Sequence, residues 1–430
     1  MEHAVLLKST RVLDPQGPWH NQVVDVLLHA GQIADIAPTL DAPEATLLHA
    51  EGSCLSAGWV DGQAHFREPG EETKEGLSQG LKAASQGGFT AVAVLPSTHP
   101  CVDHAVAVRN LVATAERANH AGIPTQALPL ACITEQAQGK QLAEMHDLSE
   151  AGAVAFTDDA PQDRVGVLQR ALTYGKVHGK TIVDDPLDRD LNAGGLMHEG
   201  VVSTEMGLIG IPSEAETLRV ARDLDVLKYA GGRLHLSILT TAAGVELVRQ
   251  AKQAGLKVTC GTTALHLAYC DEDLRGFVGT LRVRSPFRSK ADRDALRQGV
   301  LDGTVDVVIS DHRPEDLEHH DVEFMLSPEG VASLPSAFAL ALSGLAEVSS
   351  VEEATAALVR ALTSGPRHVL SLENVKVEKG ASCNLTWFHP QQAHVPHNGS
   401  RGVNLPPLKD NLHGQVLGVF RESRNWVSGR

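Results

Sequence analysis

The stretch GWVDGQAHFREPG at residues 58–70 carries side chains that could bind a metal ion. An apolar run leads into Gln63, His65 and Arg67, and residues two apart on a strand point to the same side. A His-x-His pair at this place would grip a metal from one side, but an amide stands at the first position. The pattern is typical of a metal site in which one imidazole has been changed.

Further carboxylates and imidazoles follow other apolar runs along the chain. FTDDA supplies Asp158 and Asp159, KTIVDD ends in Asp185, and SDHRPE supplies Asp311 and His312. Side chains of these types, gathered around one ion, hold a metal that activates water for hydrolysis. The sequence therefore points to hydrolytic chemistry, if the fold brings these run ends together.

The middle of the chain alternates short apolar runs with amphipathic segments. We predict strands at 59–65, 89–96, 126–133, 153–158, 180–185, 233–239, 257–262 and 305–311. Helix-like segments such as 214–231 lie between them, and several end in glycine, a natural helix C-terminus. Eight such repeats predict a TIM (β/α)8 barrel, in which catalytic groups sit at the carboxyl ends of the strands. A doubly wound open sheet is the alternative, weakened because no G-x-G-x-x-G follows an early strand.

Both ends of the chain are rich in short β-type runs separated by turn residues. We expect them to form one small β-sandwich domain together. The predicted division is residues 1–55 and 373–430 for the β-domain and 56–372 for the barrel.

Composition excludes several classes of protein. The net charge of −16 and the pI of about 5.7 argue against binding to nucleic acid or to an anionic membrane. The first residues do not read as a signal peptide, and no run approaches 18 apolar residues. The six cysteines form no CxxC pair, so reduced thiols in a cytoplasmic protein are expected.

Three long blocks resemble the class I dihydroorotases of the amidohydrolase superfamily. They are DGQAHFREPGEETKEGLSQGLKAASQGGFTAVAVLPSTHP, GLMHEGVVSTEMGLIGIPSEAETLRVARDL and SPFRSKADRDALRQGVLDGTVDVVISDHRP. The likeness spans nearly the whole chain and implies a barrel with a split β-domain. Active members of that family interconvert dihydroorotate and N-carbamoyl-aspartate.

The resemblance also implies a centre of two zinc ions and places its ligands. Carried onto this chain, the ligand positions hold Gln63, His65, Asp158, Asp185, Ile238 and Asp311. Three of the family's four imidazoles are replaced, glutamine is a poor zinc ligand, and isoleucine has no donor atom. No cofactor is therefore expected, and Asp311, which handles protons in the family, is expected to be a vestigial catalytic residue.

The positions that bind substrate in the family have changed as well. Arg67 keeps the place that grips the substrate carboxylate, whereas Ser97 and Arg284 stand where the family has asparagine. Glu315 stands where the family has histidine. A glutamate facing an anionic substrate is repulsive unless Arg284 offsets it, so this pocket is also expected to be vestigial.

These changes favour a chain that lacks catalysis, most like the zinc-less dihydroorotase-like proteins that the resemblance includes. That subgroup implies a structural partner of the aspartate transcarbamoylase catalytic chain in a large hetero-oligomer, with self-dimerisation. The alternative is an active dihydroorotase or related cyclic amidohydrolase whose rebuilt centre holds zinc or another divalent cation. Its ligands would be His65, Asp158, Asp185 and Asp311. A sensor that holds an anion on Arg67 and Arg284 is the third hypothesis.

Other motifs favour structural interpretations. MHEG at 197–200 lacks the second histidine of H-E-x-x-H, and His319 with His320 lies in an acidic loop. Cys260 and Cys270 have no neighbouring base in the sequence and are expected to be buried thiols. His312 is expected to be a loop cap.

Overall fold

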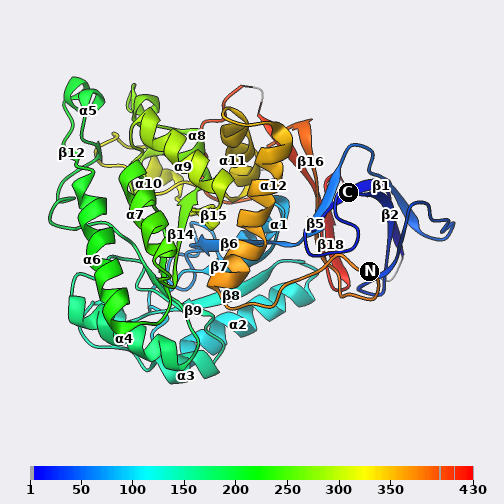
Figure 1. The fold of residues 1–430 in the computed structure, drawn as a ribbon, viewed down its shortest axis with the longest axis horizontal. Coiled ribbons are helices and arrows are strands. Elements are labelled where there is room, and N and C mark those ends of the chain that lie inside the picture. The colour runs from blue at the N-terminus through cyan, green and yellow to red at the C-terminus, as the bar shows by residue number, and fades with distance from the viewer. Residues whose placement is uncertain (1–3, 397–398, 411, 430) are drawn as a thin grey trace.

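Eight short parallel strands form the centre of the computed structural model, which describes residues 4–396, 399–410 and 412–429. They lie side by side in the order β15-β14-β13-β10-β9-β8-β7-β6 and are surrounded by helices (Figure 1). The strands are β6 (Trp59–Ala64), β7 (Phe89–Val94), β8 (Gln126–Ala131), β9 (Ala155–Phe156), β10 (Ile182–Asp184), β13 (Leu234–Leu236), β14 (Val258–Thr263) and β15 (Val307–Ile309). Each falls within a predicted run or extends one residue beyond it.

The first and last strands of this sheet meet and close the barrel. The amide of His65 donates to the carbonyl of His312 at 2.8 Å, and Ala64 and His312 form a parallel bridge. Below them, the buried carboxylate of Asp61 accepts from the Ser310 amide at 2.8 Å and from the Ser310 hydroxyl. The strand ends therefore converge on one rim, as a (β/α)8 barrel requires.

Apolar side chains fill the barrel interior. One buried cluster takes members from nearly every strand, including Val60, Ala93, Leu130, Val183 and Ile309. Strands buried on both faces read as continuous apolar runs, which explains why they stood out in the sequence. The barrel interior is therefore a packed apolar core, and the polar side chains lie at the rim.

Helices on the outside follow the strands. They are α1 (Leu77–Gln86), α2 (Ala105–His120), α3 (Met145–Glu150), α4 (Val165–Val177), α6 (Glu214–Ala230), α7 (Ala242–Gln253), α9 (Lys290–Asp302) and α12 (Val351–Leu362). Local signals begin several of them: the Thr241 hydroxyl accepts from the Gly244 amide, and Ser350 forms a capping box with Glu353. Further helices lie in the connections: α5 (Val201–Met206), α8 (Ala264–Ala268), α10 (Leu317–His320), α11 (Ala337–Ala346) and α13 (Ser364–Val369).

Two further strands, β11 (Met197–His198) and β12 (Gly210–Ile211), pair in the long connection between β10 and α6. That connection also carries α5 and projects from the barrel (Figure 1). Among the described residues, no helix has the length and apolar character needed to cross a membrane.

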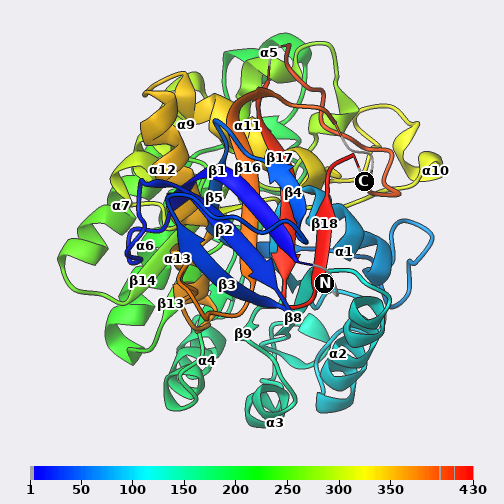
Figure 2. The ribbon, with the colours of Figure 1, turned by 90° about the vertical axis from the view of Figure 1, so that its right-hand side faces the viewer.

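Both chain ends build a second sheet beside the barrel (Figure 2). Its strands are β1 (Val5–Leu13), β2 (Val23–His29), β3 (Gln32–Ala37), β4 (Thr46–His49), β5 (Cys54–Ala57), β16 (Asn384–Ala393), β17 (His413–Arg421) and β18 (Arg424–Val427). The central pairing joins β5 to β16, far apart in sequence, and a separate apolar core includes Leu7, Leu385 and Phe420. The predicted barrel with a small β-domain from both ends is confirmed.

Trp59 joins the two domains at the start of β6. Its amide donates to the Thr386 hydroxyl at 3.1 Å, and its ring lies 5.0 Å from that of Phe388, both on β16. The Phe338 ring of α11 lies 4.4 Å from the Trp59 ring and 5.1 Å from that of Phe388, between centroids, so the three rings form one cluster. The β-domain therefore packs against the first strand of the barrel and helps to fix it.

Candidate functional site at the barrel mouth

The carboxylates predicted from the strand ends gather at one rim of the barrel. Asp159 follows β9, Asp185 follows β10 and Asp311 follows β15, and all three are buried. Buried carboxylates that converge in this way repel one another unless cations pair with them. The surrounding structure supplies those cations as arginines.

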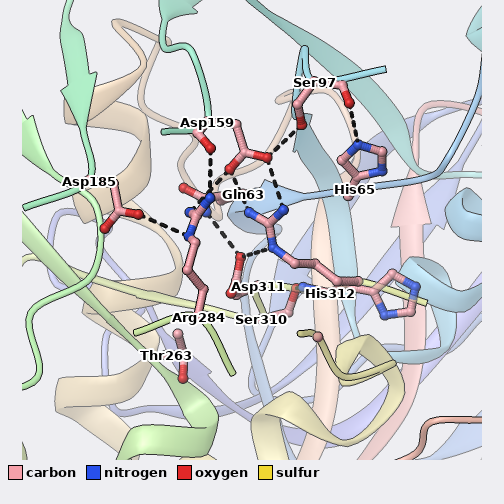
Figure 3. A network of polar contacts seen from close by, with 12 residues as sticks. Gln63, His65, Ser97, Asp159, Asp185, Thr263, Arg284, Ser310, Asp311 and His312 are labelled. Carbon is pink, nitrogen blue, oxygen red and sulfur yellow. Dashed lines mark hydrogen bonds and ion pairs between the residues drawn. The ribbon is translucent and has the colours of Figure 1, made fainter. Parts of the chain in front are cut away.

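Arg313 and Arg284 bridge the three carboxylates. Arg313 donates from both terminal nitrogens to Asp159, at 2.9 and 2.6 Å, and from Nε to Asp311 Oδ1 at 3.0 Å. Arg284 contacts Asp159 Oδ1 at 3.2 Å and Asp185 Oδ2 at 3.0 Å (Figure 3). One connected ion-pair network therefore spans the mouth from β9 to β15.

The pKa values of these groups follow from burial and pairing. Burial raises the pKa of Asp159, but Arg313 and Arg284 outweigh it and hold this carboxyl well below its usual range. Burial also raises the pKa of Asp185, against the opposing effect of Arg284. Asp159, with two guanidinium partners, is thus more firmly ionised than Asp185.

Three residues of the site have a left-handed backbone although none is glycine. The φ angles are 61° at Arg67, 52° at Asp159 and 46° at Asp311. Such conformations cost of order 1–3 kcal/mol and tend to cluster at functional sites. Here they turn the side chains that follow β6, β9 and β15.

His65 has both ring nitrogens engaged by the protein itself. Its Nε2–H donates to the Ser97 carbonyl at 3.2 Å, and its Nδ1 accepts from the Arg67 amide at 3.0 Å. Burial, followed by the charges of Arg67 and Arg313, lowers the pKa of His65 to about 4. The imidazole is therefore neutral and has no free lone pair to offer a metal.

Asp158 lies apart from the arginine network. It accepts from the Thr134 amide at 2.9 Å, from the Thr134 hydroxyl at 2.6 Å and from the Gln162 amide group. Burial is the largest influence on this carboxyl and raises its pKa. Asp158 was predicted as the metal ligand of the fourth strand, but its neighbour Asp159 is the residue that contacts Arg313 and Arg284.

The residues present do not fit a centre of two zinc ions. Gln63 donates from Nε2 to Asp311 Oδ1 at 3.0 Å, and Ile238 packs in the apolar interior cluster. Asp185 and Asp311 are paired with arginine, and His65 is fully bonded. Within the described ranges, no group of three or more His, Cys, Asp or Glu side chains is arranged to hold a metal ion.

The predicted substrate-binding positions are all near this mouth, but their partners differ from expectation. Ser97 donates its hydroxyl to Asp159 Oδ2 at 2.5 Å. Glu315 is held by Arg67 at 2.5 Å and by Lys74 at 2.8 Å. Arg284 does not offset the charge of Glu315, because it is engaged with Asp159 and Asp185.

Sequence reasoning missed Arg313 and Lys74 as members of the site. Arg313 could have been predicted, because it stands two residues after Asp311 in SDHRPE. Several buried carboxylates close together need cations to pair with them. Lys74 had no comparable signal, since it lies in the connection before α1 and contacts Glu315 across 241 residues of sequence.

The remaining motifs are structural in this fold. His198 of MHEG lies on β11 and contacts an Arg288 terminal nitrogen at 3.3 Å, while His319 is exposed on α10. His312 is buried, and its Nδ1 accepts from the Leu334 amide at 3.3 Å, which agrees with a role in holding the loop. Cys260 and Cys270 are buried free thiols, and burial raises the pKa of each.

A barrel with a split β-domain and carboxylates at its strand ends defines the architecture of the amidohydrolase class. Solved structures share this fold across the whole chain. L-hydantoinase from Arthrobacter aurescens matches with a TM-score of 0.81 at 18% identity, covering 99% of this chain and 96% of that one. D-hydantoinase from a Thermus species matches with a TM-score of 0.77 at 16% identity, covering 98% and 95%.

Sequence comparison narrows the class to one family. The Dihydro-orotase-like family matches residues 52–243. The dihydroorotase of Syntrophus aciditrophicus (strain SB) is 37% identical over 98% of both chains. That of Pelotomaculum thermopropionicum is 36% identical over 94% of this chain and 93% of its own. The chain belongs to the dihydroorotase family.

These relatives correct two expectations. The expectation of a chain without catalysis is contradicted by near full-length similarity to proteins named dihydroorotase. The expectation of no cofactor is contradicted as well, because the chain belongs to the dihydroorotase family, whose members are metal-dependent amidohydrolases. Both expectations came from ligand substitutions, which show that the two-zinc arrangement has changed but do not by themselves decide turnover.

Proposed function

We propose that the chain acts on the substrate pair of the dihydroorotases, the cyclic amide dihydroorotate and its open form N-carbamoyl-aspartate. The observation that carries this proposal is the 37% identity to a dihydroorotase over 98% of both chains. The position of Asp311, at the end of the eighth barrel strand, supports it, since catalytic groups of this fold lie there.

Asp311 is the residue to which we assign proton transfer. Gln63 and Arg313 both donate to its Oδ1, at 3.0 Å each, which fixes the carboxylate and leaves Oδ2 for a substrate proton. General acid–base catalysis by a positioned group contributes about 10²–10⁴-fold in rate.

The test is a ring-opening and ring-closing assay on the purified chain, with zinc, with manganese and with no added metal. We expect turnover in at least one condition and a loss of about 100-fold or more in Asp311→Asn, from the contribution of a general acid–base group. The exposed Glu205→Gln variant is the control and should keep full activity. Absence of turnover in every condition, or equal turnover in Asp311→Asn, would refute the proposal.

We also propose association with the aspartate transcarbamoylase catalytic chain and self-dimerisation. The support is the family resemblance, because that enzyme makes the N-carbamoyl-aspartate on which dihydroorotases act. Mixing the two purified chains and measuring the mass of the assembly by light scattering tests it. Masses equal to those of the separate chains would count against both associations.

A further inference from the structure

The side-chain carboxylate of Glu315 forms an ion pair with Arg67 at the barrel mouth. Glu315 places Oε1 at 2.5 Å from Arg67 and Oε2 at 2.8 Å from Lys74, and its side chain is 3% exposed. Two cations of one site therefore hold the two oxygens of one carboxylate. These contacts show that Arg67 and Lys74 together can bind the two oxygens of one carboxylate.

The loop that follows β15 fixes Glu315 in this position. The Glu315 amide donates to Asn404 Oδ1 at 2.8 Å, and its carbonyl accepts from the Val403 amide at 2.9 Å. Arg67 is bound to the same loop, since its Nε donates to the Pro314 carbonyl at 3.1 Å. The backbone on both sides is thus held, and the side chain of Glu315 is the part that can turn.

Lys74 gives Glu315 a second partner. Glu71 lies at 2.7 Å from Lys74 and at 3.4 Å from Arg67, so the cluster contains two cations and two carboxylates. Burial lowers the pKa of Lys74, but hydrogen bonds to Glu315 and Glu71 outweigh it and raise the pKa overall. Lys74 is therefore charged, and it can keep Glu315 paired when Arg67 takes another partner.

Exchange of partners is feasible because it leaves no buried charge unpaired. Removing one partner of a buried ion pair costs several kcal/mol when the other is left uncompensated. If a ligand carboxylate replaced Oε1 on Arg67, Glu315 would still contact Lys74 through Oε2. The same ligand would also bring a negative charge close to Glu315, which opposes its binding.

We propose that Glu315 is an internal competitor that sets the affinity of the site for ligands carrying a carboxylate, with Lys74 retaining Glu315 when such a ligand takes Arg67. This inference rests on the proposed substrate class, since dihydroorotate carries a ring carboxylate. Glu315 acts here as a specificity-determining residue that need not touch the reacting amide.

The test uses two ligands that do not undergo ring opening and differ in one carboxylate, orotate and uracil. Titration calorimetry on the full chain gives their Kd values for the wild type, Glu315→Gln and Lys74→Met. We expect Glu315→Gln to bind orotate about tenfold more tightly, equivalent to about 1.4 kcal/mol, with uracil unchanged. Lys74→Met should weaken orotate several-fold, because the displaced Glu315 then has no partner.

Glu315→Asp provides a second variant that keeps the charge but shortens the reach towards Arg67. It should tighten orotate by less than Glu315→Gln does. Equal changes for orotate and uracil, or no gain for orotate in Glu315→Gln, would overturn the inference. Because binding is measured without turnover, this result is independent of whether the ring-opening assay succeeds.

Discussion

Arg313 holds Asp159 with both terminal nitrogens, at 2.9 and 2.6 Å, and so ties the end of the eighth barrel strand to the end of the fourth. Paired geometry of this kind is the strongest form of arginine–carboxylate contact. The pair also explains how three buried carboxylates coexist at one rim, since the same arginine bonds Asp311.

Replacing Arg313 by methionine should destabilise the protein by about 3 kcal/mol or more, because Asp159 would remain buried with only Arg284 to pair it. Urea unfolding monitored by circular dichroism measures the change. Combining it with Asp159→Asn in a double-mutant cycle should give a coupling energy of about 1 kcal/mol or more. Arg275→Met, which breaks the exposed contact with Glu205, should cost less than about 1 kcal/mol. Equal losses from both arginines would contradict this account.

Ile238 stands at a position where the family pattern has a histidine, yet its side chain is part of the apolar barrel interior. Ile238→His should lower the free energy of unfolding by about 2–3 kcal/mol, because it buries an imidazole that has no partner there. Ile238→Val, which only removes a methylene, should cost about 1 kcal/mol. Thermal or urea unfolding compares the two, and a neutral Ile238→His would show that the interior can rearrange to satisfy the ring.

The buried histidines His65 and His266 should contribute less stability as the pH is lowered from about 6.5 towards 4, against the opposite contribution of Asp61, whose pKa burial raises to about 7. Burial lowers the pKa of His65 to about 4 and that of His266 to about 4, from an ordinary 6.5. Between these values the unfolded chain binds a proton that the folded chain does not, so the stabilisation is complete above pH 6.5 and is lost as pH falls through 4. Each such histidine contributes up to about 1.4 kcal/mol per pH unit.

Urea unfolding at intervals between pH 4.5 and 7.5 measures this dependence. His65→Gln should reduce the slope around pH 5 by about 1.4 kcal/mol per pH unit at most, since one titrating group is removed. His20 is exposed, and His20→Gln is the matched control, in which the contribution of His65 to the slope stays in place. A slope that is unchanged in His65→Gln would mean that this ring is protonated in the folded protein.

Much of the fold could be predicted because its signals are local. The apolar run at 89–96 corresponds to β7 (Phe89–Val94), and the amphipathic segment at 214–231 corresponds to α6 (Glu214–Ala230). The run at 153–158 shrinks to the two residues of β9, because only Ala155 and Phe156 pair with β8, and of these only Phe156 also pairs with β10. Strand length depends on neighbours that the local sequence does not specify.

The position of the site could be predicted from the sequence, but the contacts between its residues could not. Strand ends located Asp185 and Asp311 at the rim, since parallel strands of a barrel end together. Whether Asp158 or Asp159 turns towards the mouth depends on a left-handed backbone at Asp159, which alternation along a strand does not predict. The reach of Arg284 to Asp159, across 125 positions of sequence, depends on loop geometry in the same way.

Both eight-stranded sheets of the molecule are completed by segments that are far apart in the chain. The barrel seam joins Asp61 to Ser310, and the β-domain joins β5 to β16. During synthesis on the ribosome, the emerging N-terminal strands therefore keep open edges until their distant partners leave the exit tunnel. Unpaired edges of this kind recruit other chains, so prematurely terminated products of this gene should be prone to aggregation and proteolysis.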